Sequence, residues 1–173
     1  MFVRKAGPAD ASGIARVHVE SWRTTYRGIV PDSVLDNLSV EKRENHWKQD
    51  LRQGKSRTFV AETSGGEIVG FACGGPERTK AYGYDGELYA IYLLQKCQRK
   101  GLGSRLFRAA AQELAADGFR TLLVWVLADN PSRRFYEALG GEKVAEKPVT
   151  IGEATLREIA YGWKDIGALV DPE

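Results

Sequence analysis

The chain has 173 residues, of which 43% are apolar and 28% charged, and its formal net charge is +2. This length and composition predict one domain over residues 1–173, with a core that needs no disulfide or structural metal. The near-neutral charge argues against nucleic acid as a partner, and no apolar run is long enough to predict a membrane-spanning helix.

The two cysteines indicate the redox state of the protein and the kinds of site that it can have. Cys73 and Cys97 lie in different strand contexts, without metal-ligand spacing and without a histidine nearby in the sequence. This pattern predicts reduced thiols, no metal site and no nucleophilic cysteine. The N-terminus also lacks the charged and apolar regions of a secretion signal, so we expect a cytoplasmic protein.

The first 54 residues predict a strand followed by helices. Residues 2–5 have strand character, and Asp10 is placed to cap a helix that carries Ile14 and Val17 on its apolar face. Pro31 suits the first turn of a second helix, and residues 40–52 form a charged amphipathic pattern that predicts a third.

The segment 21–29, SWRTTYRGI, is denser in aromatic and basic residues than its neighbours. Arg23, Tyr26 and Arg27 are candidates for binding an anionic group of a ligand. The alternative is that they brace the junction before Pro31. The sequence alone leaves both interpretations open.

The middle of the chain predicts a hairpin and a loop. Residues 58–62 and 67–74 alternate around Ser64-Gly65-Gly66, which is typical of two antiparallel strands joined by a tight turn. The polar stretch 77–86, which is flanked by glycine and proline, predicts a loop.

A strand, a glycine-rich turn and a helix start follow in one run. Residues 88–94 form a buried strand pattern, and a helical apolar pattern begins at Leu102 and ends before Gly118. Gly101 and Gly103 lie at the helix start, where free amides and the helix dipole favour an anion such as a pyrophosphate. Arg99, Lys100 and Arg105 add positive charge, and the alternative is a tight turn with a solvated basic face.

The C-terminal third predicts three more strands and a short helix. Residues 122–127 form a nearly continuous apolar run, typical of a strand covered on both faces, and Asn130 before Pro131 is placed to cap a short helix. Residues 142–146 and 156–163 are strand-like, with 148–152 as their connection. This hairpin is expected at the end of the sheet, where it favours pairing with a second copy as a homodimer.

These motifs resemble a known family. The turn matches the pattern [QR]-x-x-G-x-[GA], the coenzyme A motif of the GCN5-related N-acetyltransferase (GNAT) family, with Gln98, Gly101 and Gly103 at its fixed positions. Asn130 and the segment FYEALG, residues 135–140, resemble the next conserved part of the family. The resemblance covers residues 87–141 and departs from the family at Gln95-Lys96-Cys97.

The resemblance implies the fold and the cosubstrate. The fold class is α/β (α+β), with a mixed, mostly antiparallel central sheet, helices on both faces and two parallel strands that splay apart. Acetyl-CoA enters that opening with its pyrophosphate on the glycine-rich turn. The residues expected at acetyl-CoA are Ile91, Tyr92, Leu93, Gln98, Arg99, Lys100, Gly101, Leu102, Gly103, Ser104 and Asn130.

Two residues are the candidates for proton transfer. By the resemblance, Tyr136 is the general acid that protonates the departing thiolate; the alternative is a buried aromatic with no chemical role. An alkylamine with a pKa near 10.4 must lose a proton before it attacks, and Glu87 is placed to accept that proton directly or through a water. The alternative for Glu87 is a solvated charge at a strand edge.

The expected function is transfer of an acetyl group from acetyl-CoA to a primary amine, of a small molecule or a peptide N-terminus, by direct attack. A longer acyl group would fit the same turn. The alternative outside enzymes is a coenzyme A-binding sensor that has lost turnover. The acceptor walls are expected in the first helices, the 75–86 loop and the terminal strands.

Overall fold

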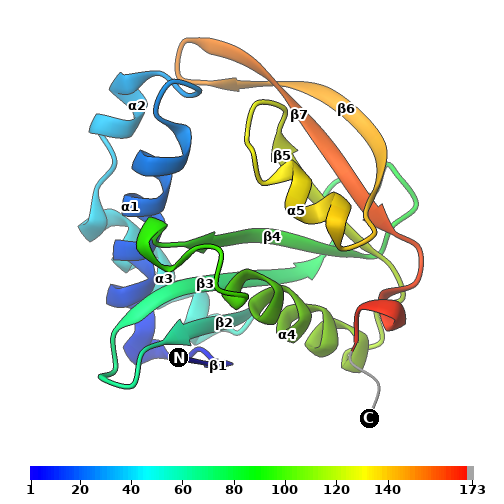
Figure 1. Cartoon of the computed structure of the whole chain (residues 1–173), viewed down its shortest axis with the longest axis horizontal. Helices are drawn as coiled ribbons and strands as arrows, with labels where there is room; N and C mark the ends of the chain where they lie inside the picture. The colour runs from blue at the N-terminus through cyan, green and yellow to red at the C-terminus, as the bar shows by residue number, and fades with distance from the viewer. Residues whose placement is uncertain (171–173) are drawn as a thin grey trace.

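The computed structural model describes residues 1–170, which fold as seven strands in one mixed sheet with helices packed against it (Figure 1). The strands are β1 Phe2–Lys5, β2 Arg57–Glu62, β3 Ile68–Pro76, β4 Gly86–Leu93, β5 Leu122–Leu127, β6 Glu142–Ile151 and β7 Ala154–Trp163. The helices of more than one turn are α1 Ala11–Tyr26, α2 Asp32–Asp36, α3 Val40–Gln53, α4 Leu102–Ala116 and α5 Arg133–Ala138.

The strand order is β1-β2-β3-β4-β5-β7-β6, and every neighbouring pair is antiparallel except β4 and β5. The predicted mixed sheet is therefore confirmed. β6 is the outer strand, whereas β7 is paired on both sides. Within residues 1–170, no helix combines the length and apolarity needed to cross a bilayer.

Two consecutive residues of β3 show how the two faces are covered. A side chain at Gly70 would meet Leu93 and Leu106, so this face of the strand lies directly under α4. The next residue, Phe71, points the other way and packs against His18 of α1 and Trp47 of α3. Because successive strand residues face opposite sides, the sheet lies between α4 and the α1–α3 pair, as Figure 1 shows.

The starts of α3 and α1 are held by different side-chain contacts. Ser39 Oγ accepts a hydrogen bond from the Lys42 N–H at 3.2 Å at the start of α3. Asp10 is the N-cap residue of α1, yet its carboxylate bonds the Gly7 N–H at 2.7 Å and pairs with Arg4 instead. The aspartate thus ties β1 to the start of α1.

The C-terminal hairpin is longer than the sequence predicts. Residues 148–151 were expected in the connection, but they continue β6, and the turn is Gly152-Glu153. The register of β6 with β7 carries on through Pro148 opposite Arg157. A proline is tolerated there because β6 is the edge strand of the sheet.

The tip of this hairpin rests on the start of the chain. The backbone of Gly152 lies against Val34 of α2, so that a side chain at Gly152 would overlap Val34. Val149, Ile151 and Leu156 pack on the same apolar cluster as α2, and Figure 1 shows the β6–β7 turn beside α2. The hairpin therefore bridges over the sheet toward α1 and α2.

Candidate active site

The parallel strands β4 and β5 separate soon after they pair. Their register contains only Gly86 with Leu122, Glu87 with Leu123, and Leu88 with Val124. Tyr89 then forms a bulge against β3, since Cys73 is opposite Ala90 while Gly74 is opposite Leu88. Such bulges re-aim the strand, and the two strands diverge beyond this point.

A cavity of about 730 Å³ opens between the diverging strands. One half is lined by the turn before α4 and by α5, and the other by α1, β5 and the β6–β7 hairpin. Its volume is typical of a small-molecule site. Tyr89 and Tyr136 also line it.

The glycine-rich turn has the backbone of an anion cradle. Arg99 and Gly101 both have positive φ, at +61° and +80°, and the first turn of α4 begins with the bond from the Arg105 N–H to the Gly101 carbonyl. The amides that precede this bond have no partner within the helix. A non-glycine residue held at positive φ costs energy and is typical of functional turns. The turn thus has the free helix amides that the phosphate prediction requires.

The end of β4 is fixed by side chains from two elements. The Leu93 carbonyl accepts hydrogen bonds from Ser21 Oγ at 3.2 Å and from Gln98 Nε2 at 3.3 Å. Gln98 therefore positions the turn as well as lining the cavity. Past Leu88, β4 has no strand partner on the β5 side among the described residues, which leaves its backbone groups available to a ligand.

Tyr136 is a largely buried residue of the cavity wall. Its ring packs against Phe107, Phe135 and Tyr161, and only 5% of the residue is exposed. Its hydroxyl has no hydrogen-bond partner among residues 1–170, and burial raises the pKa of Tyr136 above its usual range. The hydroxyl is therefore protonated at neutral pH and free to donate.

Asn130 belongs to a buried hydrogen-bond chain beside this tyrosine. Its amide nitrogen donates to the Tyr26 hydroxyl at 3.4 Å, and Tyr26 shares a hydrogen bond of 2.9 Å with Tyr92. Burial raises the pKa of Tyr26 and of Tyr92, so both stay neutral. The Asn130 side-chain oxygen accepts from the Ser132 N–H at 2.9 Å, which turns the chain into α5. The N-cap residue of α5 is Ser132, two residues after Asn130, so the predicted cap residue was wrong.

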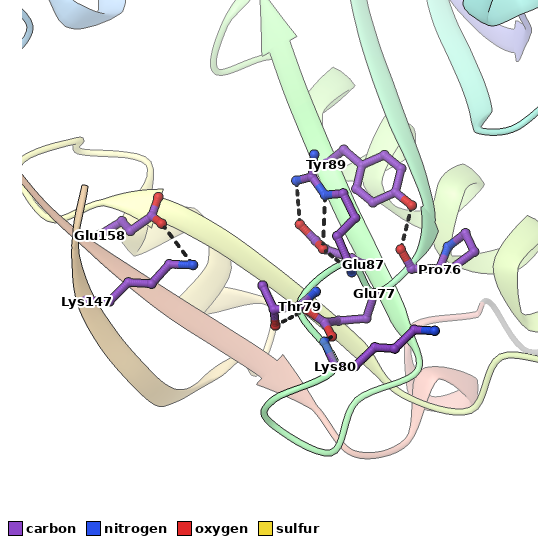
Figure 2. A network of polar contacts seen from close by, with 9 residues as sticks. Pro76, Glu77, Thr79, Lys80, Glu87, Tyr89, Lys147 and Glu158 are labelled. Atoms are coloured by element: carbon purple, nitrogen blue, oxygen red, sulfur yellow. Dashed lines mark hydrogen bonds and ion pairs between the residues drawn. The ribbon is translucent and has the colours of Figure 1, made fainter. Parts of the chain in front are cut away.

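Glu87 does not occupy the predicted position of a base exposed to the acceptor. It is buried, with 1% of the residue exposed, and it is absent from the cavity lining. Arg78 Nη2 donates to its carboxylate at 2.7 Å, and the Arg78 N–H donates at 3.1 Å. Figure 2 shows Glu87 and Tyr89 on β4 beside the turn that holds Glu77, Thr79 and Lys80.

The geometry therefore gives Glu87 a supporting role, which anchors the 77–85 loop through Arg78. We expect Glu87→Gln to lower the melting temperature, because a charged hydrogen bond contributes about 1.5–3 kcal/mol and Gln leaves Arg78 without a counter-charge. In a plot of kcat/KM against pH, the fall in rate toward low pH should occur at the same pH as in the wild type. If the variant keeps its melting temperature but kcat/KM no longer falls toward low pH, Glu87 acts as the base after all.

The second half of the cavity is mainly aromatic. Its lining includes Trp22 and Tyr26 of α1, Trp125 and Leu127 of β5, and Ile151 of the hairpin. The Tyr82 ring packs edge-on against Trp125, so the 77–86 loop supports this wall from behind. The loop was expected to form a wall itself, but none of its residues lines the cavity. This half is the candidate chamber for an acceptor.

The two arginines of the 21–29 segment do not enter this chamber. Arg23 donates to the carbonyls of Leu35 and Leu38, and Arg27 pairs with Asp32 and Asp36. They brace the junction between α1 and α2, whereas Tyr26 lines the cavity. Of the two alternatives that the sequence left open, the structure favours the brace for the arginines.

His18 supports the chamber from behind. Its ring stacks on Tyr92 with a centroid distance of 5.8 Å, and its Nδ1 accepts a hydrogen bond from Trp47 at 3.4 Å. Burial lowers the pKa of His18 to about 4, so the imidazole is neutral at physiological pH. His18 therefore packs as an uncharged aromatic ring, and His46 is exposed.

The structure brings most of the predicted site residues to one cavity. Glu87, Lys100 and Leu102 do not line it; Leu102 is buried and Lys100 is exposed. Sequence reasoning did not identify several lining residues, although the alternation of 122–127 and 156–163 carries the signal for some of them. The predicted residues that line the cavity are Ile91, Tyr92, Leu93, Gln98, Arg99, Gly101, Gly103, Ser104, Asn130 and Tyr136. The missed ones include Tyr89, Trp125, Leu127, Ile151 and Glu158.

Nothing else among the described residues competes with this cavity as a chemical site. Cys73 and Cys97 are free and buried, and burial raises the pKa of Cys73 to about 12. Within residues 1–170 no three side chains of the metal-binding types gather.

Comparison with known proteins points in one direction. Residues 18–141 match the profile of the Acetyltransferase (GNAT) family. The uncharacterized N-acetyltransferase YuaI of Bacillus subtilis is 45% identical over 167 residues, which covers 96% of this chain and 95% of that protein. The phosphinothricin N-acetyltransferase of Streptomyces viridochromogenes is 33% identical over 145 residues, with 80% and 73% covered.

A solved structure shares the fold at low sequence identity. The putative acetyltransferase yncA from Salmonella typhimurium, determined with acetyl-CoA, superposes with a TM-score of 0.72 and 19% identity. The match covers 100% of this chain and 95% of that chain.

Proposed function

The chain belongs to the GNAT acetyltransferase family, and from this premise we propose that its acceptor is a small primary amine bound in the aromatic chamber. The protein is an N-acetyltransferase, and acetyl-CoA is its cosubstrate. The observation that carries the proposal is one continuous cavity, which joins the phosphate-type turn, the free Tyr136 hydroxyl and the chamber.

The residues present fit acetyl-CoA. Its pyrophosphate would lie at the amides of the Gly101–Ser104 turn, with Arg99 adding positive charge, and its arm would follow the unpaired edge of β4. Acetyl-CoA supplies the activated acetyl group as a thioester. The β4 backbone amides supply the donors that favour charge on the carbonyl oxygen during attack.

The proposed reaction is a direct transfer. The amine nitrogen forms a bond to the acetyl carbon while the bond from that carbon to sulfur breaks. The bound ammonium first gives one proton to solvent, so that the neutral amine attacks. The leaving thiolate takes the proton of the Tyr136 hydroxyl, and the second proton of the nitrogen, released as the amide forms, returns to the Tyr136 oxygen through solvent. No cysteine participates, because both thiols are buried and neither lines the cavity.

Enclosure of the chamber favours a small molecule over a protein N-terminus. The β6–β7 tip rests on α2 and closes the chamber on the side of Ile151 and Leu127. A folded protein partner would need an open groove at this place. A small amine needs only the volume that the cavity already has.

An acceptor panel tests this function. Purified protein with acetyl-CoA should release free thiol with small primary amines and respond weakly to peptides that start with alanine or serine. A peptide preference would contradict the small-molecule acceptor. Binding of acetyl-CoA without any thiol release would favour the coenzyme A sensor.

Two further expectations stay predictions. A homodimer would form along β6, the ten-residue outer strand, where Val144 is an exposed apolar residue. A cytoplasmic location rests on the cysteine pattern of the sequence.

A further inference from the structure

The charges of the cavity are few and unevenly placed. Among the lining residues, Glu158 is the single carboxylate and Arg99 the single cation. Arg99 belongs to the turn before α4, at the coenzyme end. The acceptor chamber therefore carries one negative group among aromatic rings and no positive lining residue.

Glu158 is held by the hairpin at the level of the divergent strands. In the register of β7 it lies opposite Leu127 of β5 on one side and Lys147 of β6 on the other. Figure 2 shows the Glu158 and Lys147 side chains together on the hairpin, apart from the Glu87 group on β4. Glu158 is thus separate from Glu87, whose carboxylate is bonded to Arg78 of the 77–85 loop.

The Glu158 carboxylate retains capacity to bind a cation. It accepts no hydrogen bond from any residue of the described chain, and 19% of its side chain is exposed. The Lys147 ammonium is 3.5 Å away, which is longer than the 2.7–2.9 Å of a charge-assisted hydrogen bond. An ammonium from a ligand can approach more closely than this lysine does.

The position of Lys147 indicates what this corner of the cavity attracts. Its ammonium lies 4.1 Å from the centre of the Trp125 ring, within the range of a cation–π contact, and beside Glu158. Trp125 and Glu158 both line the cavity, whereas Lys147 does not. An aromatic face next to a carboxylate is a pair of groups that recognises an alkylammonium ion.

We propose that Glu158, with the Trp125 ring, recognises the ammonium form of the acceptor, and that the acceptor class is a primary amine on an apolar or aromatic body with no carboxylate beside the nitrogen. This inference rests on the proposed amine acetylation. The rings of Trp22 and Tyr26 suit such a body. A carboxylate beside the nitrogen would be repelled by Glu158, and the nearest ammonium, that of Lys147, already pairs with Glu158 and does not itself line the chamber.

A matched pair of probes tests the class. Phenethylamine and phenylalanine share the aromatic body and the primary amine and differ in the carboxylate. Wild-type protein should acetylate phenethylamine with a kcat/KM at least about tenfold higher. Equal or better use of phenylalanine would overturn the proposal.

A matched pair of variants tests the residue. Glu158→Gln should lower kcat/KM for phenethylamine about tenfold to thirtyfold, mainly through KM, with the KM of acetyl-CoA unchanged, and should narrow the preference over phenylalanine. Glu153→Gln removes a charge from the exposed turn of the same hairpin and should match the wild type. An unchanged Glu158→Gln, or an equal loss in both variants, would overturn the assignment.

Lys147→Met separates recognition from a structural ion pair. If Glu158 binds the substrate ammonium, removing Lys147 takes away a competing cation, so the KM for phenethylamine should fall or stay the same. If the Lys147–Glu158 ion pair only stabilises the hairpin, Lys147→Met and Glu158→Gln should both have lower activity and a lower melting temperature. That result would overturn the proposal.

A binding measurement keeps this result distinct from the proposed function. Phenethylamine should change the tryptophan fluorescence of the wild type, because Trp22 and Trp125 line the cavity, and the affinity should drop in Glu158→Gln. Binding of this kind without acetylation would uphold the recognition site and refute the enzymatic proposal. If both proteins acetylate phenethylamine and bind it with the same affinity, the enzymatic proposal stands and the recognition site at Glu158 is refuted.

Discussion

Replacing Tyr136 with phenylalanine should lower turnover about a hundredfold and leave the KM of acetyl-CoA nearly unchanged, since a positioned general acid contributes roughly that much. The ring packs against Phe107, Phe135 and Tyr161, and phenylalanine preserves this packing. The lost hydroxyl has no hydrogen-bond partner in the described chain, so its removal breaks no internal contact. Steady-state kinetics across pH measures the effect.

Tyr161→Phe is the matched control for this experiment. The Tyr161 hydroxyl donates to Glu137 at 2.9 Å and accepts from Arg133 at 3.2 Å, and the residue does not line the cavity. This variant should lose stability and keep turnover. Wild-type turnover in Tyr136→Phe at every pH would refute the acid role, and a raised KM alone would mean that the hydroxyl only holds the cosubstrate.

Gly103→Val should abolish measurable acetyl-CoA binding in the micromolar range, a loss of about a hundredfold or more. A Cβ at this residue would lie 3.4 Å from the Phe135 ring and 3.6 Å from Leu93, which is ordinary contact. The two further carbons of valine have no such room, and they would enter the cradle where a phosphate meets the helix amides. Calorimetric titration with coenzyme A on folded protein measures the loss.

Gly103→Ala separates crowding from backbone strain. Gly103 is not among the residues with positive φ, and one methyl group fits its surroundings, so alanine should weaken binding only slightly. A loss as large as that of valine would point to the backbone instead. Unchanged affinity in the valine variant would remove the turn from the binding site.

The coenzyme half of the site was predictable because its signals are local. Gln98, Gly101 and Gly103 lie within one turn between a strand and a helix, and free helix amides follow from that order alone. Tyr136 was identified through the resemblance. Its unpaired hydroxyl is a tertiary fact that only the structure shows.

The acceptor half was not predictable because it depends on pairing between distant segments. Glu158 reaches the chamber through the register of β7 with β5, and the sequence shows only that it alternates with larger residues. The burial of Glu87 was not predictable for a related reason, since its partner Arg78 lies in a loop whose return path onto β4 has no local signature. Pro148 similarly suggested a connection, although an edge strand tolerates it.

The contact of the β6–β7 tip with α2 has a kinetic consequence for folding. The unit β4–α4–β5 joins nearby segments, so the coenzyme half can form with little loop-closure entropy. The chamber requires Gly152 to meet Val34 from the opposite end of the chain, so that closure should come late. During synthesis the coenzyme cradle would take shape before the hairpin leaves the ribosome, and the acceptor chamber would be completed last.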